Sequence, residues 1–384
     1  MFELFLISFY KLARKVYICF MKINQLINKL QHWAPFNYQE SYDNSGLIVG
    51  DPQAEIEKIL ISLDITEAVM EEAIQGPYQL IISHHPIIFK GLKSLTGKTP
   101  EERVLIAAIK NNIAIIALHT NLDNALHGVN ARIAKILGLH HVRILEPKTN
   151  VLKKLAVFVP VEHMEKLRSS LFNAGAGEIG DYDQCSFISE GQGSFRGKEN
   201  SNPFVGEIGK QHHEPETKLE IIFPQHRQAD IMKAIYQNHP YEEPAFDIYK
   251  LENQHPKIGA GIIGELPEAM NQDEFLHFLK KSMNTQCIRH TETDGIKIKN
   301  IALCGGSGSF LIKSARAAKA DVFISGDIKY HDFFEANKQF MIADIGHYES
   351  EQFTKELIHD FLIENFPKFA VQISEHQTNP IKYF

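Results

Sequence analysis

Residues 78–89 read YQLIISHHPIIF. The run Gln79–Ser83 predicts a short buried strand because it is apolar and rich in β-branched side chains. We expect the strand to end at His84 and His85, because the following Pro86 lacks the N–H that a β-ladder needs. Two imidazoles therefore stand at the carboxyl end of a strand, where open α/β sheets place their ligand-binding crevices.

The geometry of a strand leaves two arrangements open for this histidine pair. Successive residues of an ideal strand face opposite ways, so His84 and His85 bind one ion only if the chain turns at Pro86. Otherwise each histidine serves a different metal. A polar strand end with histidines that face solvent is the alternative without a function.

The length and composition of the chain exclude several classes of protein. A chain of 384 residues is too long for one ordinary core and predicts two or three domains. The hydrophobic fraction of 44% and the charged fraction of 23% are typical of a globular protein. The net charge is −7 and no block of Lys and Arg occurs, so a nucleic acid is not expected as the partner.

Two further features bear on the cellular setting. The four cysteines show neither CxxC spacing nor disulfide density, which indicates a reducing cytoplasm. Residues 1–20, MFELFLISFYKLARKVYICF, fit neither a secretory signal nor a spanning helix, so no membrane association is expected. We interpret them as an N-terminal extension from an upstream start codon, or otherwise as a short surface helix, and expect the folded chain to begin at Met21.

Strands and helices alternate in the first part of the chain. Apolar runs followed by amphipathic stretches predict a parallel or mostly parallel sheet with helices, and hence an α/β fold. Thr99 and Glu102 flank Pro100 in the pattern of a capping box with proline at the first helical position. The expected strands are 59–65, 79–83 and 113–118, and the expected helices are 21–32, 66–75, 100–111 and 121–137.

A different pattern follows. Two β-α-β passages occur in about a hundred residues, which predicts a ferredoxin-like α+β insert. Residues 191–209 are rich in Gly, Ser and Asn and are expected to form a loop with one short strand, and residues 255–264 to form a linker. The expected strands are 155–160, 218–223 and 245–251, and the expected helices are 161–174 and 227–238.

The last part of the chain returns to the first pattern. We therefore predict one α/β domain, made of residues 21–150 and 255–384, that is interrupted by an insert of residues 151–254. The expected strands are 298–304, 321–325, 340–344 and 370–373, and the expected helices are 271–283, 310–320, 330–337 and 347–365.

Two more strand ends carry candidate metal ligands. His119 ends the strand 113–118, and Asp123 lies in the first turn of the next helix, where a carboxylate is electrostatically favoured or serves as a cap. His347 and Glu351 follow the strand 340–344 and stand four residues apart on one face of a helix. An exposed pair on a helical turn has the same spacing. The His347–Glu351 pair therefore indicates a metal site only in combination with the other two strand ends.

Taken together, these strand ends predict a metal centre. Imidazoles and carboxylates without thiolates suit zinc, iron, manganese or cobalt. His84, His85, His119, Asp123, His347 and Glu351 exceed what one ion needs, so two divalent ions with a bridging carboxylate are expected. Such a pair lowers the pKa of a shared water and stabilises a developing oxyanion.

Five segments, in order along the chain, extend this prediction to a family. SHHPIIF, HTNLDNA, GGSGS, SGDIKYHD and GHYESE resemble the Nif-three-like family of dinuclear-metal proteins, the GTP cyclohydrolase 1 type 2 homologues, over about residues 21–384. The resemblance implies that the metal ligands are His84, His85, Asp123, His347 and Glu351, with Glu351 as the bridge and His119 beside them. It also implies toroidal homohexamers. The insert resembles the PII-like and CutA-like domains, with His239-Pro240-Tyr241-Glu242 as the best local match, although these residues equally well close a helix and order a turn.

Two further groups of residues are weaker candidates. Gly305, Gly306, Ser307 and Gly308 would hold an anion on backbone N–H groups if they formed a loop before a helix, although a tight structural turn fits equally well. His331 and His119 are candidates for proton transfer.

We therefore expect a cytoplasmic metal-dependent hydrolase that acts on a small nucleotide-like or phosphorylated substrate. The alternative is a non-catalytic protein in which the metals serve assembly or regulation, and a metal store is a third reading.

Overall fold

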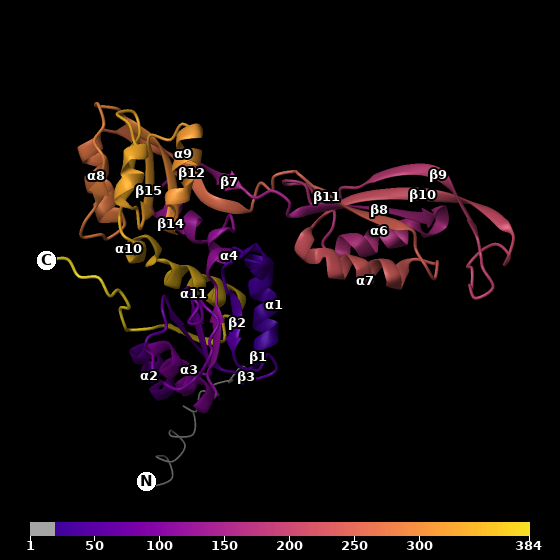
Figure 1. Ribbon diagram of the computed structural model, residues 1–384, viewed down its shortest axis with the longest axis horizontal. Helices are drawn as coiled ribbons and strands as arrows, with labels where there is room; N and C mark the ends of the chain where they lie inside the picture. Colours follow the sequence, from indigo (N-terminus) through magenta and orange to yellow (C-terminus); the bar gives the residue numbers. More distant parts are fainter. Residues whose placement is uncertain (1–19) are drawn as a thin grey trace, which may run out of the picture. The chain divides into compact units, whose positions relative to one another are not determined.

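The computed structural model describes residues 20–384, so our prediction for residues 1–20 lies outside the described part except at Phe20. The chain forms two compact units (Figure 1). Unit 1 combines the chain up to Val142 with Gly261–Phe384, and unit 2 consists of Arg143–Ala260. The predicted α/β fold class with an α+β insert is confirmed.

The first sheet of unit 1 has five strands in the order β17-β4-β5-β6-β2. Four of them run parallel, and β2 lies antiparallel to β6. The three central strands are almost entirely buried, as the near-continuous apolar runs of a covered parallel sheet require. The strands are β2 (Gly46–Val49), β4 (Lys58–Ser62), β5 (Leu80–Ser83), β6 (Ala114–Ala117) and β17 (Ala370–Ile373).

Helices α2 (Glu67–Gln75) and α3 (Pro100–Lys110) pack on this sheet through one apolar cluster. Thr66 and Thr99 cap them, each accepting a hydrogen bond from a backbone N–H three residues later. The predicted capping box is only half formed, because the Glu102 carboxylate accepts from the N–H groups of Thr96 and Lys98 instead. The cluster contains Leu60, Ile65, Val69, Met70, Ala73, Ile81, Val104, Ala108, Ile113 and Ile115.

The second sheet has six strands in the order β13-β16-β15-β14-β12-β7. Strands β14, β15 and β16 are parallel, while β12 is antiparallel to β14 and β13 is antiparallel to β16. Both sheets therefore contain antiparallel edges, and the sheets are mixed. The strands are β7 (His140–Pro147), β12 (Gly259–Met270), β13 (Arg289–His290), β14 (Ile298–Ser307), β15 (Val322–Gly326) and β16 (Met341–Asp344).

The remaining elements of unit 1 are helices and one short ribbon. Strands β1 (Met21–Lys22) and β3 (Glu55–Ile56) pair with each other. The helices are α1 (Ile23–Trp33), α4 (Thr120–Asp123), α5 (Val129–Ile136), α8 (Gln272–Ser282), α9 (Ile312–Ala317), α10 (His347–Glu351) and α11 (Thr354–Asn365), with a 3-10 helix η5 (Tyr330–Glu335).

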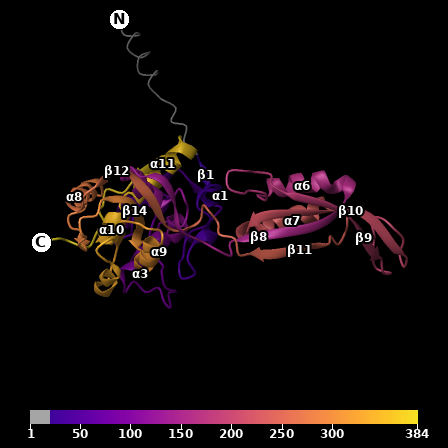
Figure 2. The ribbon, with the colours of Figure 1, turned by 90° about the horizontal axis from the view of Figure 1, so that it is seen from above.

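Unit 2 is a ferredoxin-like β-α-β-β-α-β fold. Its four-stranded antiparallel sheet has the order β11-β8-β10-β9. Helices α6 and α7 lie on the same face of this sheet (Figures 1 and 2). The elements are β8 (Leu152–Pro160), α6 (Met164–Asn173), β9 (Phe187–Arg196), β10 (Gln211–Pro224), α7 (Gln228–Asn238) and β11 (Phe246–Leu251).

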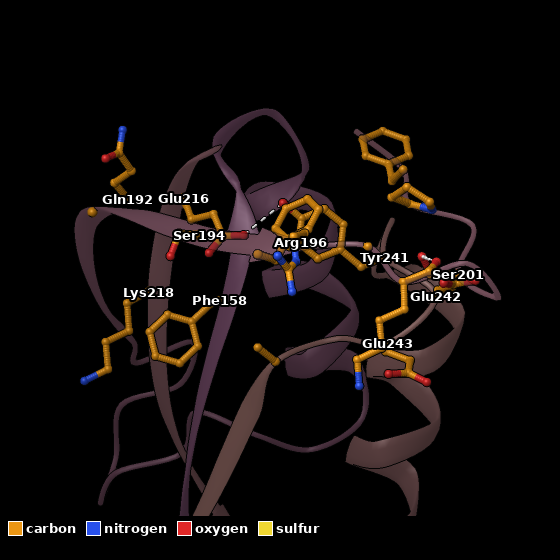
Figure 3. Close-up of a pocket in the computed structure, with 18 of the residues that line it drawn as sticks. Phe158, Gln192, Ser194, Arg196, Ser201, Glu216, Lys218, Tyr241, Glu242 and Glu243 are labelled. Atoms are coloured by element: carbon orange, nitrogen blue, oxygen red, sulfur yellow. Dashed lines mark hydrogen bonds between the residues drawn. The ribbon is translucent and has the colours of Figure 1, made fainter. Parts of the chain in front are cut away.

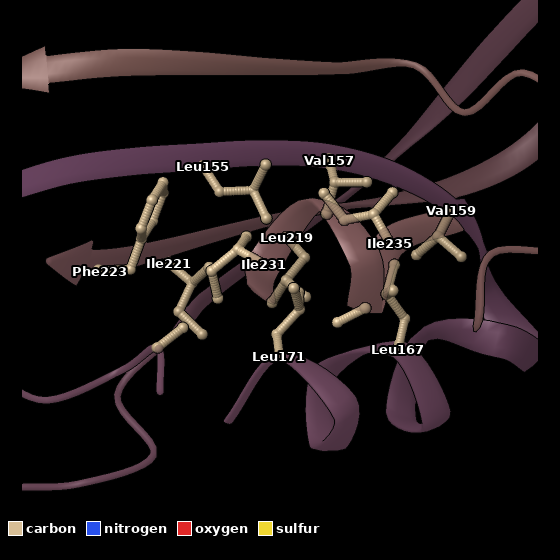
Figure 4. Close-up of a cluster of buried hydrophobic side chains, with 12 residues drawn as sticks. Leu155, Val157, Val159, Leu167, Leu171, Leu219, Ile221, Phe223, Ile231 and Ile235 are labelled. Atoms are coloured by element: carbon tan, nitrogen blue, oxygen red, sulfur yellow. The ribbon is translucent and has the colours of Figure 1, made fainter. Parts of the chain in front are cut away.

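Unit 2 has its own hydrophobic core (Figure 4). Alternate residues of β8 and β10 point toward α6 and α7, as the two-residue period of a strand demands. The buried side chains include Leu155, Val157, Val159, Leu167, Leu171, Leu219, Ile221, Phe223, Ile231 and Ile235.

Several predicted elements differ from the structure. The single helix expected over 121–137 is two helices, because the chain turns so tightly at Gly128 that an added Cβ would lie 1.7 Å from the Leu122 carbonyl oxygen. The helix expected over 347–365 is also interrupted, and the Gln352 side chain donates to the Glu349 carbonyl oxygen at the break.

Two other predicted segments were wrong, and a third differs only in its bounds. Residues 191–209 hold one strand and a loop, as expected, but the strand β9 starts earlier, at Phe187, because its backbone pairs with β10 along its whole length. The expected linker 255–264 contains the start of β12, and the expected helix 330–337 is the 3-10 helix η5. Within residues 20–384, we find no helix that combines the length and the apolar character needed to cross a bilayer.

Candidate metal centre

The structure brings six predicted residues together in unit 1. His84 and His85 follow β5, His119 follows β6, and Asp123 ends α4. His347 and Glu351 are the first and last residues of α10. These side chains form three overlapping groups in which the potential ligand atoms lie within 4.8 Å of one another: His84, His85 and His119; His85, His347 and Glu351; and His84, Asp123 and Glu351.

The Glu351 carboxylate lies between two of these groups. Its Oε1 atom is 3.5 Å from His84 Nε2. Its Oε2 atom is 3.0 Å from His85 Nε2 and 3.1 Å from His347 Nε2. One oxygen therefore faces each group, which is the arrangement that a carboxylate bridging two cations requires.

Two buried polar atoms of the group His84, Asp123 and Glu351 have no hydrogen-bond partner within residues 20–384. They are His84 Nε2 and Asp123 Oδ1, and they lie 3.7 Å apart. An unsatisfied buried donor or acceptor costs about 1–3 kcal/mol, so a pair of them that face each other needs a third group. A divalent cation satisfies an imidazole nitrogen and a carboxylate oxygen at once, and the residues present therefore fit a metal ion.

The outer nitrogen of each histidine is already held. His84 Nδ1 lies 2.7 Å from the Leu118 carbonyl oxygen, His85 Nδ1 lies 2.7 Å from Asp64, and His347 Nδ1 lies 2.7 Å from Asp327. An acceptor at Nδ1 fixes the proton there and leaves the Nε2 lone pair directed inward. This is the usual outer arrangement of histidines that ligate a metal.

The pKa values of the clustered side chains show that the carboxylates make the centre strongly negative. Burial lowers the pKa of His85, but the Asp64 and Glu351 carboxylates outweigh it and raise the pKa to about 10. The same balance, with Glu351 and Asp327, raises the pKa of His347 to about 9. Burial and the neighbouring Glu351 raise the pKa of Asp123. The centre therefore attracts positive charge.

His119 is held separately from the other three histidines. Its Nδ1 atom lies 2.7 Å from Asp43 Oδ1, and its ring is edge-on to those of His84 and His85. Burial raises the pKa of Asp43, but the hydrogen bonds from His119 and Thr120 lower it further, so the carboxylate stays ionised. His119 thus presents its Nε2 side at the edge of the centre.

The glycine segment 305–308 does not form the expected loop. Its first three residues belong to β14, and the N–H groups of Gly305 and Gly306 donate to Asn130 Oδ1 and Ser350 Oγ, each at 2.8 Å. These two N–H groups are therefore not directed at an anion. Gly306 has φ +64°, and a Cβ there would lie 2.2 Å from Glu351 Oε1, so glycine makes room for the Glu351 carboxylate.

Two other histidine motifs lie away from these groups. His331 is exposed in η5, where its ring contacts Tyr330 and Phe334, and it belongs to none of the three groups. His239 closes α7, with Nε2 at 2.8 Å from the Phe158 carbonyl oxygen and Nδ1 accepting from the Tyr241 N–H. This is the structural reading of the His-Pro-Tyr segment.

Sequence reasoning missed the carboxylates behind the histidines. Asp64 follows β4, and Asp327 follows β15. Both occupy strand ends beside the predicted ligands, so the rule that selected His84 and His119 also finds them. Asp43 lies in a turn rich in Asn, Ser and Gly, where a carboxylate is ordinarily read as a turn residue.

Fold and site together define an α/β protein with a candidate metal centre of histidines and carboxylates. A family profile described as Duf34/NIF3 (NGG1p interacting factor 3) matches residues 21–380. The chain belongs to this family, as the sequence motifs predict.

Curated relatives and a solved structure agree with this assignment. A protein of Staphylococcus epidermidis named GTP cyclohydrolase 1 type 2 homolog is 37% identical over 367 residues, covering 94% of this chain and 100% of the relative. A Bacillus subtilis protein of the same name is 38% identical over 365 residues, covering 94% and 98%. The crystal structure of a Bacillus cereus protein related to NIF3 has a TM-score of 0.81 at 34% identity, covering 95% of this chain and 99% of that one.

Proposed function

We propose that this protein is a hydrolase that depends on two divalent cations, zinc, iron or manganese, and acts on a small nucleotide-like or phosphorylated substrate. The observation that carries the proposal is the position of Glu351, with Oε1 toward His84 and Oε2 toward His85 and His347. His84, Asp123 and Glu351 would hold one cation, and His85, His347 and Glu351 the other.

Proton transfer in the proposed reaction would be carried out by a residue of the chain itself. Two bound cations would supply a Lewis acid and lower the pKa of an adjacent water. His119 belongs to a group with His84 and His85, and its Nδ1 is fixed by Asp43. Its Nε2 atom is therefore the position at which this chain would hold and transfer a proton. His331 is less suited to this role, because it lies outside the three groups.

The substrate class is supported by the family, not by the side chains. The relatives bear the name GTP cyclohydrolase 1 type 2 homolog. For this chain we propose only the class of substrate that the name implies, which is a small nucleotide-like or phosphorylated molecule, and a reaction in the cytoplasm.

The test compares two glutamates of one helix. Glu351→Gln should lose both cations and all hydrolysis, whereas Glu349→Gln should retain both. Glu349 is a matched control because it is also buried in α10 but belongs to none of the three groups, and the amide oxygen of glutamine still accepts from Asn379 and Tyr383. The readouts are metal content by mass spectrometry and turnover of nucleotides and phosphoesters with each metal. Two bound cations without turnover of any substrate would contradict the hydrolase proposal.

A non-catalytic role in assembly or regulation is the second candidate, favoured by the presence of a separately folded unit 2. A His84→Ala, Glu351→Ala double variant would then lose self-association or partner binding. In that case neither the wild type nor the variant would turn over any substrate.

Self-association into a ring of six subunits is a further proposal, based on the family resemblance alone. Analytical ultracentrifugation of the wild type gives the subunit number directly, and a monomer at micromolar concentration would contradict it.

A further inference from the structure

Unit 2 contains a cavity of about 1090 Å³ that the metal centre does not use (Figure 3). It lies on the sheet face opposite α6 and α7. Leu219 and Ile221 of β10 point into the core beneath the helices, so the alternate residues Glu216 and Lys218 point the other way. The loop after β9 and the loop after α7 line the rest of the cavity.

A nearly buried carboxylate forms part of its wall. Glu216 is 8% exposed, and its Oε1 atom accepts a hydrogen bond of 2.8 Å from the Tyr241 hydroxyl. Its Oε2 atom accepts no hydrogen bond from residues 20–384. A Cβ at Gly193 would lie 2.1 Å from that oxygen, so the absence of a side chain on β9 is what lets the carboxylate lie there.

Two cations at the cavity are also without partners. Arg196 and Lys198 line it, yet neither takes part in an ion pair found within residues 20–384. In Figure 3 the labelled side chains surround an open space, with Phe158 and Lys218 on one side and Tyr241, Glu242 and Glu243 on the other. The Arg196 guanidinium, which binds carboxylates in a planar two-point geometry, lies between these sides.

Aromatic rings complete the lining. Phe158, Phe195, Phe204 and Tyr241 all border the cavity. The Tyr241 ring lies 5.9 Å from that of Phe195 and 6.3 Å from that of Phe204, and Phe204 is 48% exposed. Exposed aromatic faces inside a concave site bind flat apolar groups.

We propose that this cavity binds a small zwitterion with an aromatic ring, of the class of an aromatic amino acid or a dipeptide that contains one. Glu216 accepts from the ammonium group, Arg196 binds the carboxylate, and the aromatic rings hold the side chain. The lining carries both signs of charge, Glu190, Glu216, Glu242 and Glu243 against Arg196, Lys198 and Lys218. This balance suits a ligand with one charge of each sign and disfavours a polyphosphate.

The experiment is calorimetric titration of the full chain with phenylalanine, tyrosine, tryptophan and dipeptides that contain them, with AMP and GMP for comparison. Saturable binding of at least one amino acid or dipeptide is expected. No binding of these probes at millimolar concentration, or binding of the nucleotides alone, would overturn the proposal. Because unit 2 supplies all the residues, failure here would leave the metal proposal untouched.

Two glycines of one strand provide a matched pair of variants. Gly193→Ala should weaken binding by about tenfold or more, because the new Cβ displaces a carboxylate that hydrogen-bonds a charged group. Gly191→Ala should bind like the wild type, since a Cβ there has no atom within 4 Å. Both variants should fold, because the atom met at Gly193 ends a flexible side chain. Equal affinity of the two variants would contradict the assignment of Glu216.

The two charged contacts are separated by the choice of probe. N-acetylphenylalanine lacks the ammonium group and phenylalaninamide lacks the carboxylate. The wild type should bind phenylalanine more tightly than either probe. Glu216→Gln should no longer prefer phenylalanine over N-acetylphenylalanine, and Arg196→Met should no longer prefer phenylalanine over phenylalaninamide. If both variants keep the wild-type preference, the two residues do not contact the ligand.

Discussion

The side chain of His85 depends on a residue that does not belong to the proposed ligand set. Asp64 Oδ1 holds its Nδ1 atom at 2.7 Å, while Nε2 faces Glu351. The orientation of the imidazole and its basicity toward a metal are therefore set by Asp64.

We predict that Asp64→Asn lowers metal affinity about 10- to 100-fold, as loss of such outer carboxylates does. The amide oxygen still accepts a hydrogen bond, so the fold should be retained. Competition with a chromogenic chelator measures the affinity. Asp51→Asn is the control, because the Asp51 carboxylate is exposed and accepts from the nearby Gln53 N–H. Equal affinities of the two variants would show that Asp64 does not position His85.

His239 makes the stability of unit 2 depend on pH. Burial lowers its pKa, which the Phe158 carbonyl and Glu216 only partly offset, with His163 adding to the decrease. Its Nδ1 also accepts from Tyr241, so protonation breaks that bond. A histidine whose folded pKa lies below the unfolded value contributes fully above the unfolded pKa, about 6.5, and loses this contribution as pH falls.

We therefore predict that the wild type loses more stability than His239→Gln between pH 7.5 and pH 5.5. Glutamine cannot gain a proton in this range, which removes the effect. Hydrogen exchange of the unit 2 segments at both pH values measures it. An identical loss in both proteins would contradict the assignment.

At the level of single residues, much of the candidate centre could be predicted. His84, His119 and His347 could be predicted because each follows the carboxyl end of an apolar strand. The roles of Asp64, Asp327 and Asp43 could not be predicted with the same ease, because a strand-end carboxylate is as often a cap or a turn residue. Only the folded chain shows that each lies behind a histidine.

At the level of elements, the C-terminal segment 374–384 is tied to the proposed centre. The Thr378 hydroxyl donates to Asp64 Oδ2 at 2.6 Å, on the carboxylate that holds His85. Asn379 and Tyr383 bond to Glu349 of α10, the helix that carries His347 and Glu351. The segment therefore stabilises proposed ligands on both sides of unit 2 in the sequence: His85 through Asp64, and His347 and Glu351 through α10.

We predict that Thr378→Val weakens metal binding several-fold, whereas Thr378→Ser behaves like the wild type because it keeps the hydroxyl. A hydrogen bond to a charged group contributes about 1.5–3 kcal/mol, and only part of that reaches His85 through Asp64. The dissociation rate of bound metal into excess chelator is the measurement. Equal rates for the valine and serine variants would exclude this stabilising role.

Elements whose evidence is local were predicted best. Strand β17 (Ala370–Ile373) has its predicted bounds, and α3 begins at Pro100 as predicted. The bounds of strand β9 were not predicted, because Gly191 and Gly193 favour a loop locally and only pairing with the distant β10 fixes the strand. The breaks in the two long predicted helices arise from close contacts that a 3.6-residue period does not report.

At the level of the whole molecule, each unit has a separate core, so damage to one should spare the other. Leu171 is fully buried between α6 and the sheet of unit 2. Leu171→Ala should cost about 2–5 kcal/mol and increase hydrogen exchange throughout unit 2 without changing metal content. Ile179→Ala, at a residue that is 53% exposed, is the control. Loss of metal in the Leu171 variant would show that the units are not independent.

The division of the proposed ligands along the chain has a consequence for biosynthesis. His84, His85 and Asp123 precede unit 2 in sequence, whereas His347 and Glu351 follow it. A polypeptide still emerging from the ribosome lacks the glutamate that both proposed cations would share until unit 2 has been synthesised. Under the proposed function, uptake of both cations would therefore follow the synthesis of unit 2, and a nascent product truncated before Glu351 should be released without cations.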